Sequence, residues 1–149
     1  MSISTILLPI TNSLDTEALN YTKELALSNN ANLIVLYITS PLTFTSCYSY
    51  PSILYSVANL NMESINIAHQ CLTQKIDSLL TDCPHEVICL IGPHMDTIIN
   101  VARQKNVDLI VVPGAKEHSL DKLIHHTNKD KLSKKTKIPV MIYDGKKEA

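Results

Sequence analysis

Five short segments of the chain are almost continuously apolar, and this pattern restricts the fold more than any other feature. Each is rich in isoleucine, leucine and valine and lacks the polar alternation of a half-exposed strand. Such runs are typical of strands that are covered on both faces of a parallel sheet. The segments are Thr5–Ile10, Asn32–Ile38, Glu86–Ile91, Asp108–Val112 and Ile138–Tyr143.

The stretches between these runs repeat apolar residues at helical spacing. The repeats comprise Leu14, Ala18, Tyr21 and Leu25, then Ile65, Ala68, Leu72, Ile76 and Leu79, and then Met95, Ile98 and Ala102. We expect Ser13 or Asp15 to cap the first helix, and the second helix to end near Cys83-Pro84. Strands that alternate with helices and cross over in the right-handed sense predict an α/β fold with a doubly wound sheet.

The chain of 149 residues fits one domain, which we place at residues 1–145 with a C-terminal tail at residues 146–149. One connection, at about residues 39–61, is longer than a minimal strand-to-helix unit requires. Connections of this length are often functional. It is either a lid over the carboxyl edge of the sheet or an insertion that packs its aromatic residues locally.

Composition and charge narrow the classes of partner. A net charge of −1 gives no general attraction to nucleic acid or anionic lipid. No apolar run approaches the roughly 18 residues of a membrane span, and the first residues lack the basic region of a signal peptide. We therefore expect a cytoplasmic protein without membrane or nucleic-acid partners. The four cysteines contain no C-x-x-C pair, so we expect them to be reduced and not to bind metal.

Three motifs in order carry a resemblance to a known family. They are Ile6–Ile10, Val107–Gly114 and Ile138–Ile142. With this layout, the chain resembles the universal stress protein (UspA-like) family over essentially its whole length. The resemblance implies a five-stranded parallel sheet in the order 3-2-1-4-5 with helices on both faces, a Rossmann-like fold of the adenine nucleotide alpha hydrolase-like type. It also implies a homodimer that pairs through the last strand.

The family's ATP-binding members carry a glycine-rich motif that this chain matches only in part. Gly114 matches the first glycine, Glu117 or His118 occupies the second position, and the stretch is one residue short. His126 replaces the third glycine, and Thr127 keeps the hydroxyl position. Glycines let the backbone approach phosphates, and a helix N-terminus with a hydroxyl receives their charge. These departures predict that the standard ATP site is degenerate.

The first strand departs from the family as well. Binding members place an aspartate after it to hold the adenine, and this chain has Thr11 there. If a nucleotide such as ATP or AMP binds, the resemblance places it against six positions. These are Thr11, Ile38, Gly114, His126, Thr127 and Asn128.

The last helix begins with a capping pattern and is strongly basic. Thr127 is the expected N-cap and Asp130 follows three residues later. Five lysines lie within the same stretch: Lys129, Lys131, Lys134, Lys135 and Lys137. This is either a basic surface that receives a phosphate, a nucleotide or an acidic partner, or a solvated face of the helix.

No catalytic or metal-binding residue is expected. His118, His125 and His126 cluster in sequence, but a metal site needs three or four ligands, and surface imidazoles are the simpler interpretation. The chain has no G-x-S-x-G, Walker, G-x-G-x-x-G or H-E-x-x-H motif. Cys47 has no basic neighbour to activate it, and Asp108 precedes its strand at the amino end, away from where such sheets bind ligands.

Three hypotheses for function follow. The first is a homodimeric regulatory or binding module of the stress response, without standard ATP binding, that works through a protein partner or an altered ligand. The alternative is an ATP- or AMP-binding stress switch with slow or no hydrolysis. The third is an enzyme of another nucleotide-hydrolase type, for which the sequence offers no acid or base.

Overall fold

A computed structural model of the chain describes residues 3–10, 14–39, 66–113 and 127–143. The strands are β1 (Thr5–Ile10), β2 (Asn32–Thr39), β3 (His85–Ile91), β4 (Leu109–Pro113) and β5 (Val140–Tyr143). The helices are α1 (Thr16–Asn29), α3 (His94–Gln104) and α5 (Thr127–Thr136), and a further helix spans residues 66–79. The predicted long connection, apart from Thr39, and the predicted tail lie outside the described residues.

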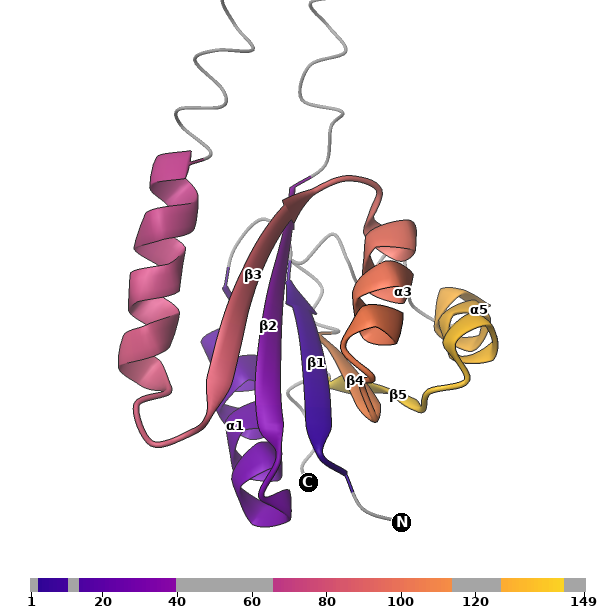
Figure 1. Cartoon of the computed structure of the whole chain (residues 1–149), viewed down its shortest axis with the longest axis horizontal. Coiled ribbons are helices and arrows are strands. Elements are labelled where there is room, and N and C mark those ends of the chain that lie inside the picture. The colour runs from indigo at the N-terminus through magenta and orange to yellow at the C-terminus, as the bar shows by residue number, and fades with distance from the viewer. Residues whose placement is uncertain (1–2, 11–13, 40–65, 114–126, 144–149) are drawn as a thin grey trace, which may run out of the picture.

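The strands form one parallel sheet in the order β3-β2-β1-β4-β5, which confirms the predicted topology (Figure 1). β5 is shorter than predicted, because it begins at Val140 and not at Ile138. Lys137 has a left-handed backbone with φ 61°, and Pro139 accepts a hydrogen bond from Ile110 N–H but has no N–H of its own to donate, so regular strand pairing starts at Val140. β4 begins one residue later than predicted, at Leu109, and the carboxylate of the preceding Asp108 accepts hydrogen bonds from the N–H groups of Ser4 and Thr5, at 2.8 and 3.1 Å.

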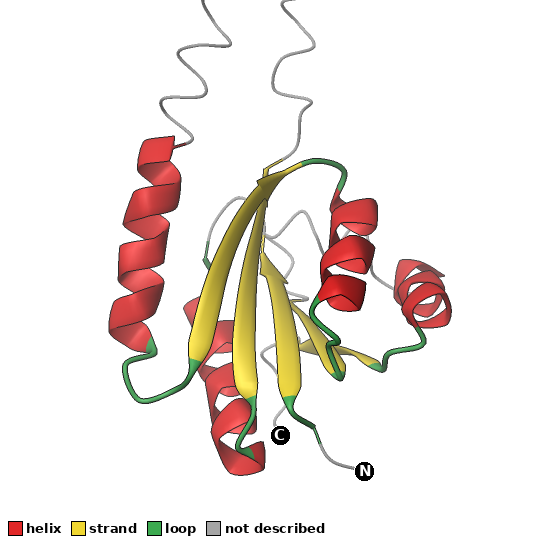
Figure 2. Cartoon of the chain, viewed as in Figure 1, coloured by secondary structure: helices red, strands yellow, loops and turns green. Residues whose placement is uncertain are grey.

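Helices cover both faces of the sheet, as predicted (Figure 2). α3 and α5 pack on one face, and α1 with the helix of residues 66–79 packs on the other. Successive strand residues alternate between the two cores: Leu7 and Leu36 contribute to the first, and Leu8 and Val35 to the second. This alternation explains why the strand sequences are continuously apolar, since neither set of side chains faces water.

For α1, the predicted cap at Asp15 is confirmed, but the predicted buried face is only partly correct. The Asp15 carboxylate accepts a hydrogen bond from Ala18 N–H at 3.1 Å and caps α1, and Asn30 ends that helix with φ 55°. The predicted stripe was wrong at Tyr21, which is 38% exposed, while Thr22 is fully buried. Thr22 satisfies its own hydroxyl by donating to the Ala18 carbonyl at 2.6 Å.

The helix of residues 66–79 also differs from its predicted face. Ala68 is exposed, whereas Ile76 and Leu80 are fully buried. The helix ends at residue 79, before the predicted Cys83-Pro84 boundary. Its second half therefore carries the packing against the sheet. Among the described residues, no helix is long and apolar enough to cross a membrane.

Candidate functional site

At the carboxyl edge of the sheet, the strand order reverses between β1 and β4. β1 is flanked by β2 on one side and by β4 on the other, so the connections after these two neighbours run to opposite halves of the sheet. Ligands of open α/β sheets bind outside the carboxyl ends of the strands at such a point. β1 pairs with β4 at Ile6–Leu109 and Leu7–Ile110, and the last described residues of the two strands are Ile10 and Pro113.

Of the six predicted ligand positions, the structure describes three in part. Ile38 lies in β2 and is 1% exposed, so its side chain belongs to the core and only its backbone remains for a ligand. Thr127 and Asn128 form the start of α5. Thr127 is thus the first residue of the α5 helix and not, as predicted, the N-cap before it.

The other predicted positions are not placed. Thr11, Gly114 and His126 lie outside the described residues, as do His118 and His125. The structure therefore does not test whether the predicted positions come together. Within the described part of the chain, no group of three or more histidine, cysteine, aspartate or glutamate side chains could hold a metal ion.

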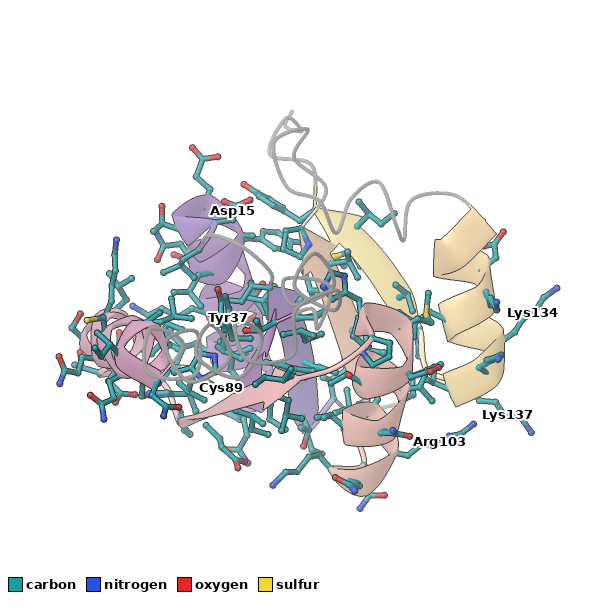
Figure 3. The ribbon with its side chains drawn as sticks, turned by 90° about the horizontal axis from the view of Figure 1, so that it is seen from above. Asp15, Tyr37, Cys89, Arg103, Lys134 and Lys137 are labelled. Carbon is teal, nitrogen blue, oxygen red and sulfur yellow. The ribbon has the colours of Figure 1, made fainter. Side chains whose placement is uncertain are left out.

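A polar cluster that the sequence did not predict lies beneath the helix of residues 66–79. The rings of Tyr37 and His69 meet edge to face, with their centroids 5.3 Å apart. The Nε2 atom of His69 lies 3.4 Å from Oγ1 of Thr39, at the carboxyl end of β2. Cys89 is the partner of Tyr37 in the register of β2 and β3, and Figure 3 shows the two residues close together.

Burial keeps this cluster uncharged near neutral pH. Desolvation lowers the pKa of His69 and raises the pKa of Tyr37. It also raises the pKa of the Cys89 thiol, against a smaller opposing effect of a hydrogen bond with Thr73. A protonated thiol is a poor nucleophile and a poor metal ligand. The cluster can therefore donate and accept hydrogen bonds, but it is unsuited to nucleophilic chemistry.

A shallow hollow of about 300 Å³ adjoins the cluster on the helix side. Its lining includes His69 and Thr73, with Gln70 and Gln74 beside them. The pairing of Tyr37 and Thr39 two residues apart in an otherwise apolar strand was the available sequence signal, since both point to one face. The partner, His69, could not be identified from the sequence because it comes from a separate element.

The turn from β3 into α3 completes the described part of this edge. Gly92 N–H donates to the Thr39 carbonyl at 2.9 Å, which ties the turn to β2. A β-carbon at Gly92 would lie 2.9 Å from Oγ1 of Thr97, so a larger residue does not fit without a shift. His94 is the first residue of α3, and burial lowers its pKa, so its imidazole is neutral at pH 7.

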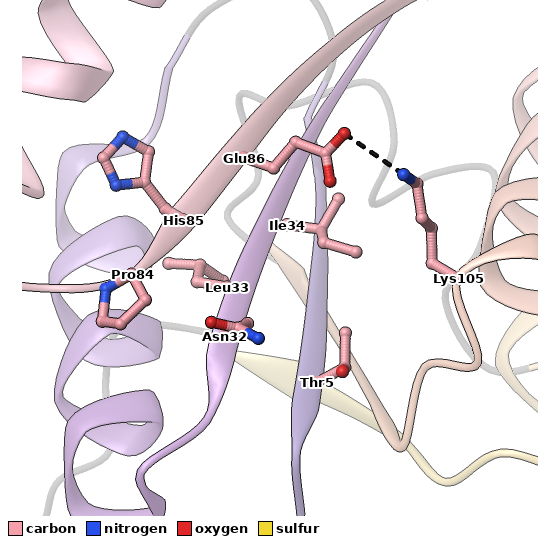
Figure 4. A pocket seen from close by; sticks show the side chains of 8 residues that line it. All are labelled: Thr5, Asn32, Leu33, Ile34, Pro84, His85, Glu86 and Lys105. Atoms are coloured by element: carbon pink, nitrogen blue, oxygen red, sulfur yellow. Dashed lines mark hydrogen bonds and ion pairs between the residues drawn. The ribbon is translucent and has the colours of Figure 1, made fainter.

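A larger hollow, of about 430 Å³, lies at the opposite, amino edge of the sheet (Figure 4). It is lined by Thr5, Asn32, Leu33, Ile34, Pro84, His85, Glu86 and Lys105. Lys105 of α3 reaches Glu86 of β3 at 3.2 Å across it. Since sheets of this type bind ligands at their carboxyl edge, we assign no site here.

Comparison with known proteins gives one consistent result. Residues 2–144 match the family model described as the universal stress protein family. A curated relative, Universal stress protein A homolog 1 from Coxiella burnetii, is 31% identical over 117 residues, which cover 72% of this chain and 73% of the relative.

Solved structures support the fold. The hypothetical protein MJ0577 has a TM-score of 0.72 at 18% identity, with 99% of this chain and 100% of that chain covered. A universal stress protein in complex with cAMP has a TM-score of 0.59 at 16% identity, with 97% of this chain and 98% of that chain covered.

Proposed function

The chain belongs to the universal stress protein family, and from this premise we propose that it is a homodimeric regulatory module of the cytoplasmic stress response. It works by binding a protein partner or an altered ligand, without the family's standard ATP site and without catalysis.

One observation carries the first part of this proposal. β1 and β4 are neighbours, so the residues that directly follow them in the chain, Thr11 and Gly114, follow from adjacent strand ends. The departures from the ATP motif therefore fall in the two segments that follow neighbouring strands in the chain. A hydroxyl replaces the adenine-holding carboxylate at Thr11, and side chains replace glycines at Glu117 or His118 and at His126. A residue with a β-carbon costs more than about 1 kcal/mol where the backbone conformation suits only glycine.

The chemistry of the described carboxyl edge supports binding over catalysis. An acid–base or nucleophilic mechanism needs a group whose pKa is shifted toward the working pH. The shifts at Tyr37 and Cys89 run in the opposite direction and keep both groups protonated, so neither is a nucleophile or a base near neutral pH.

A thermal-shift experiment tests the loss of ATP binding. A ligand at 100 times its dissociation constant stabilises its protein by about 2.7 kcal/mol, or roughly 5–10 °C in Tm for a domain of this size. We expect a shift below about 1 °C with millimolar ATP or AMP and magnesium. A Tm shift of roughly 5–10 °C would refute the proposal if the shift disappears in Thr127→Ala.

An adenine nucleotide is the second candidate ligand. The observation that favours it is that a protein of similar fold forms a complex with cAMP. In this alternative the chain is an ATP or AMP switch with slow or no hydrolysis, and Gly114, Thr127 and the backbone of Ile38 contact the nucleotide. Adding cAMP to the thermal-shift series separates the two candidates, because only the second predicts stabilisation by any of the three nucleotides.

The homodimer is proposed to form through β5, the outermost strand beside β4. The Ile110 N–H donates to the Pro139 carbonyl at 3.0 Å, so the backbone groups of Pro139 face β4. Successive residues of a strand direct their N–H and C=O groups to opposite sides, so those of Val140 and Ile142 face the outer edge. Exposed edges of this kind are usually paired or protected. Light scattering at micromolar concentration should give a dimer for the natural chain and a monomer for Ile142→Pro, which removes one outward N–H. A monomeric natural chain would exclude the dimer.

A further inference from the structure

The exposed side of α5 carries lysines and is the most strongly charged surface in the described chain. Lys131, Lys134 and Lys135 are spaced i, i+3 and i+4, so they share one side of the helix, and Lys137 follows directly after it. All four are exposed, whereas Leu132 is fully buried on the opposite side. Figure 3 shows Lys134 and Lys137 projecting outward from α5. We call these four residues the lysine face.

The lysine face has no acidic partner among the described residues. Two other lysines of the described chain do form ion pairs, Lys23 with Asp82 at 2.9 Å and Lys105 with Glu86 at 3.2 Å. None of the four lysines forms an ion pair with another described residue. Like charges this close repel one another. The arrangement therefore concentrates positive charge on one surface, against a single acidic residue of α5, Asp130.

The neighbouring helix holds this surface in place. Arg103 of α3 donates from Nη2 to the Lys135 carbonyl at 2.9 Å, which satisfies a carbonyl at the end of α5. The Thr136 hydroxyl donates to the Leu132 carbonyl at 2.7 Å, and the Lys137 N–H donates to the Ser133 carbonyl at 2.7 Å. These bonds come from the backbone and from neighbouring groups, so the fold does not use the ammonium groups of the lysines.

The backbone of Lys137 provides an independent observation. Three non-glycine residues in the described chain have positive φ: Asn30 at 55°, Asn106 at 54° and Lys137 at 61°. Asparagine tolerates this conformation because its short side chain bonds locally, whereas lysine has no such compensation. The chain thus uses the favourable residue at two positions and a strained lysine at the third. A left-handed residue commonly ends a helix, so Lys137 ends α5 as Asn30 ends α1, but without the local bond that an asparagine side chain offers.

We propose that the lysine face docks a short acidic segment of a partner protein. This deepens the proposed function, on which it rests, by giving the chemistry of the partner. From Lys131 to Lys137 the surface extends about 9 Å at 1.5 Å per residue, which matches a few consecutive acidic side chains.

The charge of the remaining chain favours a short protein segment over an extended polyanion. The chain has 13 basic and 14 acidic residues. Five of the basic residues are the lysine face and Arg103, so eight remain against fourteen acidic ones, a net charge of −6. A nucleic acid or an anionic membrane continues beyond 9 Å and would meet this opposing charge, whereas a short segment would not.

The test measures binding of a fluorescein-labelled tetraglutamate peptide by anisotropy at 50 and 300 mM salt. We expect saturable binding that weakens with salt and that weakens at least tenfold in K134E/K135E. Lys75→Glu is the matched control, because Lys75 is an exposed helical lysine outside the lysine face, and it should change affinity by less than twofold. Absence of salt-sensitive binding, or an equal loss in the control, overturns the proposal. Tighter binding to a 30-nucleotide single-stranded DNA or to phosphatidylglycerol vesicles overturns it as well.

A second variant separates a binding role from a structural one. Lys137→Asn keeps a residue that tolerates positive φ and removes the charge. We expect its Tm to equal or exceed that of the natural chain while tetraglutamate binds at least threefold more weakly. A lower Tm with unchanged affinity would show that Lys137 serves the fold and contradict the proposal. Neither result bears on ATP or on the dimer, so failure here leaves the proposed function to its own tests.

Discussion

His85 is hydrogen-bonded by two acceptors at once, and this makes the stability of the protein depend on pH in a calculable direction. Its Nε2 lies 2.7 Å from Oδ1 of Asp77, in the helix of residues 66–79, and its Nδ1 lies 2.8 Å from the Cys83 carbonyl. A neutral imidazole has one N–H, so both bonds exist only in the protonated form. Burial lowers the pKa of His85, but the Cys83 carbonyl and the Asp77 carboxylate outweigh it and the pKa is raised overall.

The sign follows from this raised pKa. A histidine that binds its proton more tightly when folded stabilises the protein fully below its unfolded pKa of 6.5, and the contribution disappears as the pH rises through the folded pKa. A hydrogen bond to a charged group is worth about 1.5–3 kcal/mol when buried. The Asp77 side chain is 57% exposed and that of His85 17% exposed, so solvent screens the pair. We therefore assign the pair of His85 and Asp77 a stabilisation of about 1 kcal/mol, the upper end of the range for exposed ion pairs.

The perturbation is Asp77→Asn, measured by urea unfolding at about pH 5.5 and pH 8.5. We expect a loss of about 1 kcal/mol at the lower pH, or roughly 2–4 °C in Tm. At the higher pH the loss should vanish or reverse, because the neutral Nε2 can accept from the asparagine amide. Asp82→Asn is the control: Lys23 lowers the pKa of Asp82, so that pair is charged at both pH values and its loss should not depend on pH. An equal or larger loss for Asp77→Asn at pH 8.5 would refute the reasoning.

Three further predictions concern the scaffold and are each checked by urea unfolding. Gly92→Ala should destabilise the protein by about 1–3 kcal/mol through overpacking against Thr97. Adding Thr97→Ala to this variant should recover most of that loss, and no recovery would mean that backbone conformation is the cause. Asp15→Ala should cost about 1 kcal/mol through loss of the α1 cap, and an unchanged midpoint would show that the cap is replaced. Leu36→Ala should cost about 2–5 kcal/mol because the side chain is fully buried, and a cost below 1 kcal/mol would mean that the core collapses around the gap.

The sheet was predictable because its strands are buried on both faces. A parallel sheet covered by helices leaves continuous apolar runs in the sequence, and the order of motifs then indicated the strand order through the family resemblance. The errors occur where local backbone chemistry overrides the pattern. β5 starts late because of Lys137 and Pro139, and the α1 face shifts because Thr22 bonds its hydroxyl to the preceding turn while Tyr21 remains half exposed.

The site was less predictable, because its contacts join distant parts of the chain. The Thr39–His69 contact links residues 30 positions apart, and no periodicity in the sequence indicates which face of the helix meets β2. His85 and Asp77 are only eight residues apart, but they lie on either side of the turn between the helix and β3, and the sequence does not show how that turn orients them. Thr11, Gly114 and His126 were identified only through the family resemblance, and they remain predictions because the structure does not describe them.

The absence of the family's standard ATP site is the central claim, and calorimetric titration of the purified protein with ATP and with AMP, in the presence of magnesium, tests it most directly. The account predicts no detectable heat of binding for either nucleotide. Micromolar binding that weakens in Thr127→Ala would contradict it, because it would show that the altered loop still receives the phosphates.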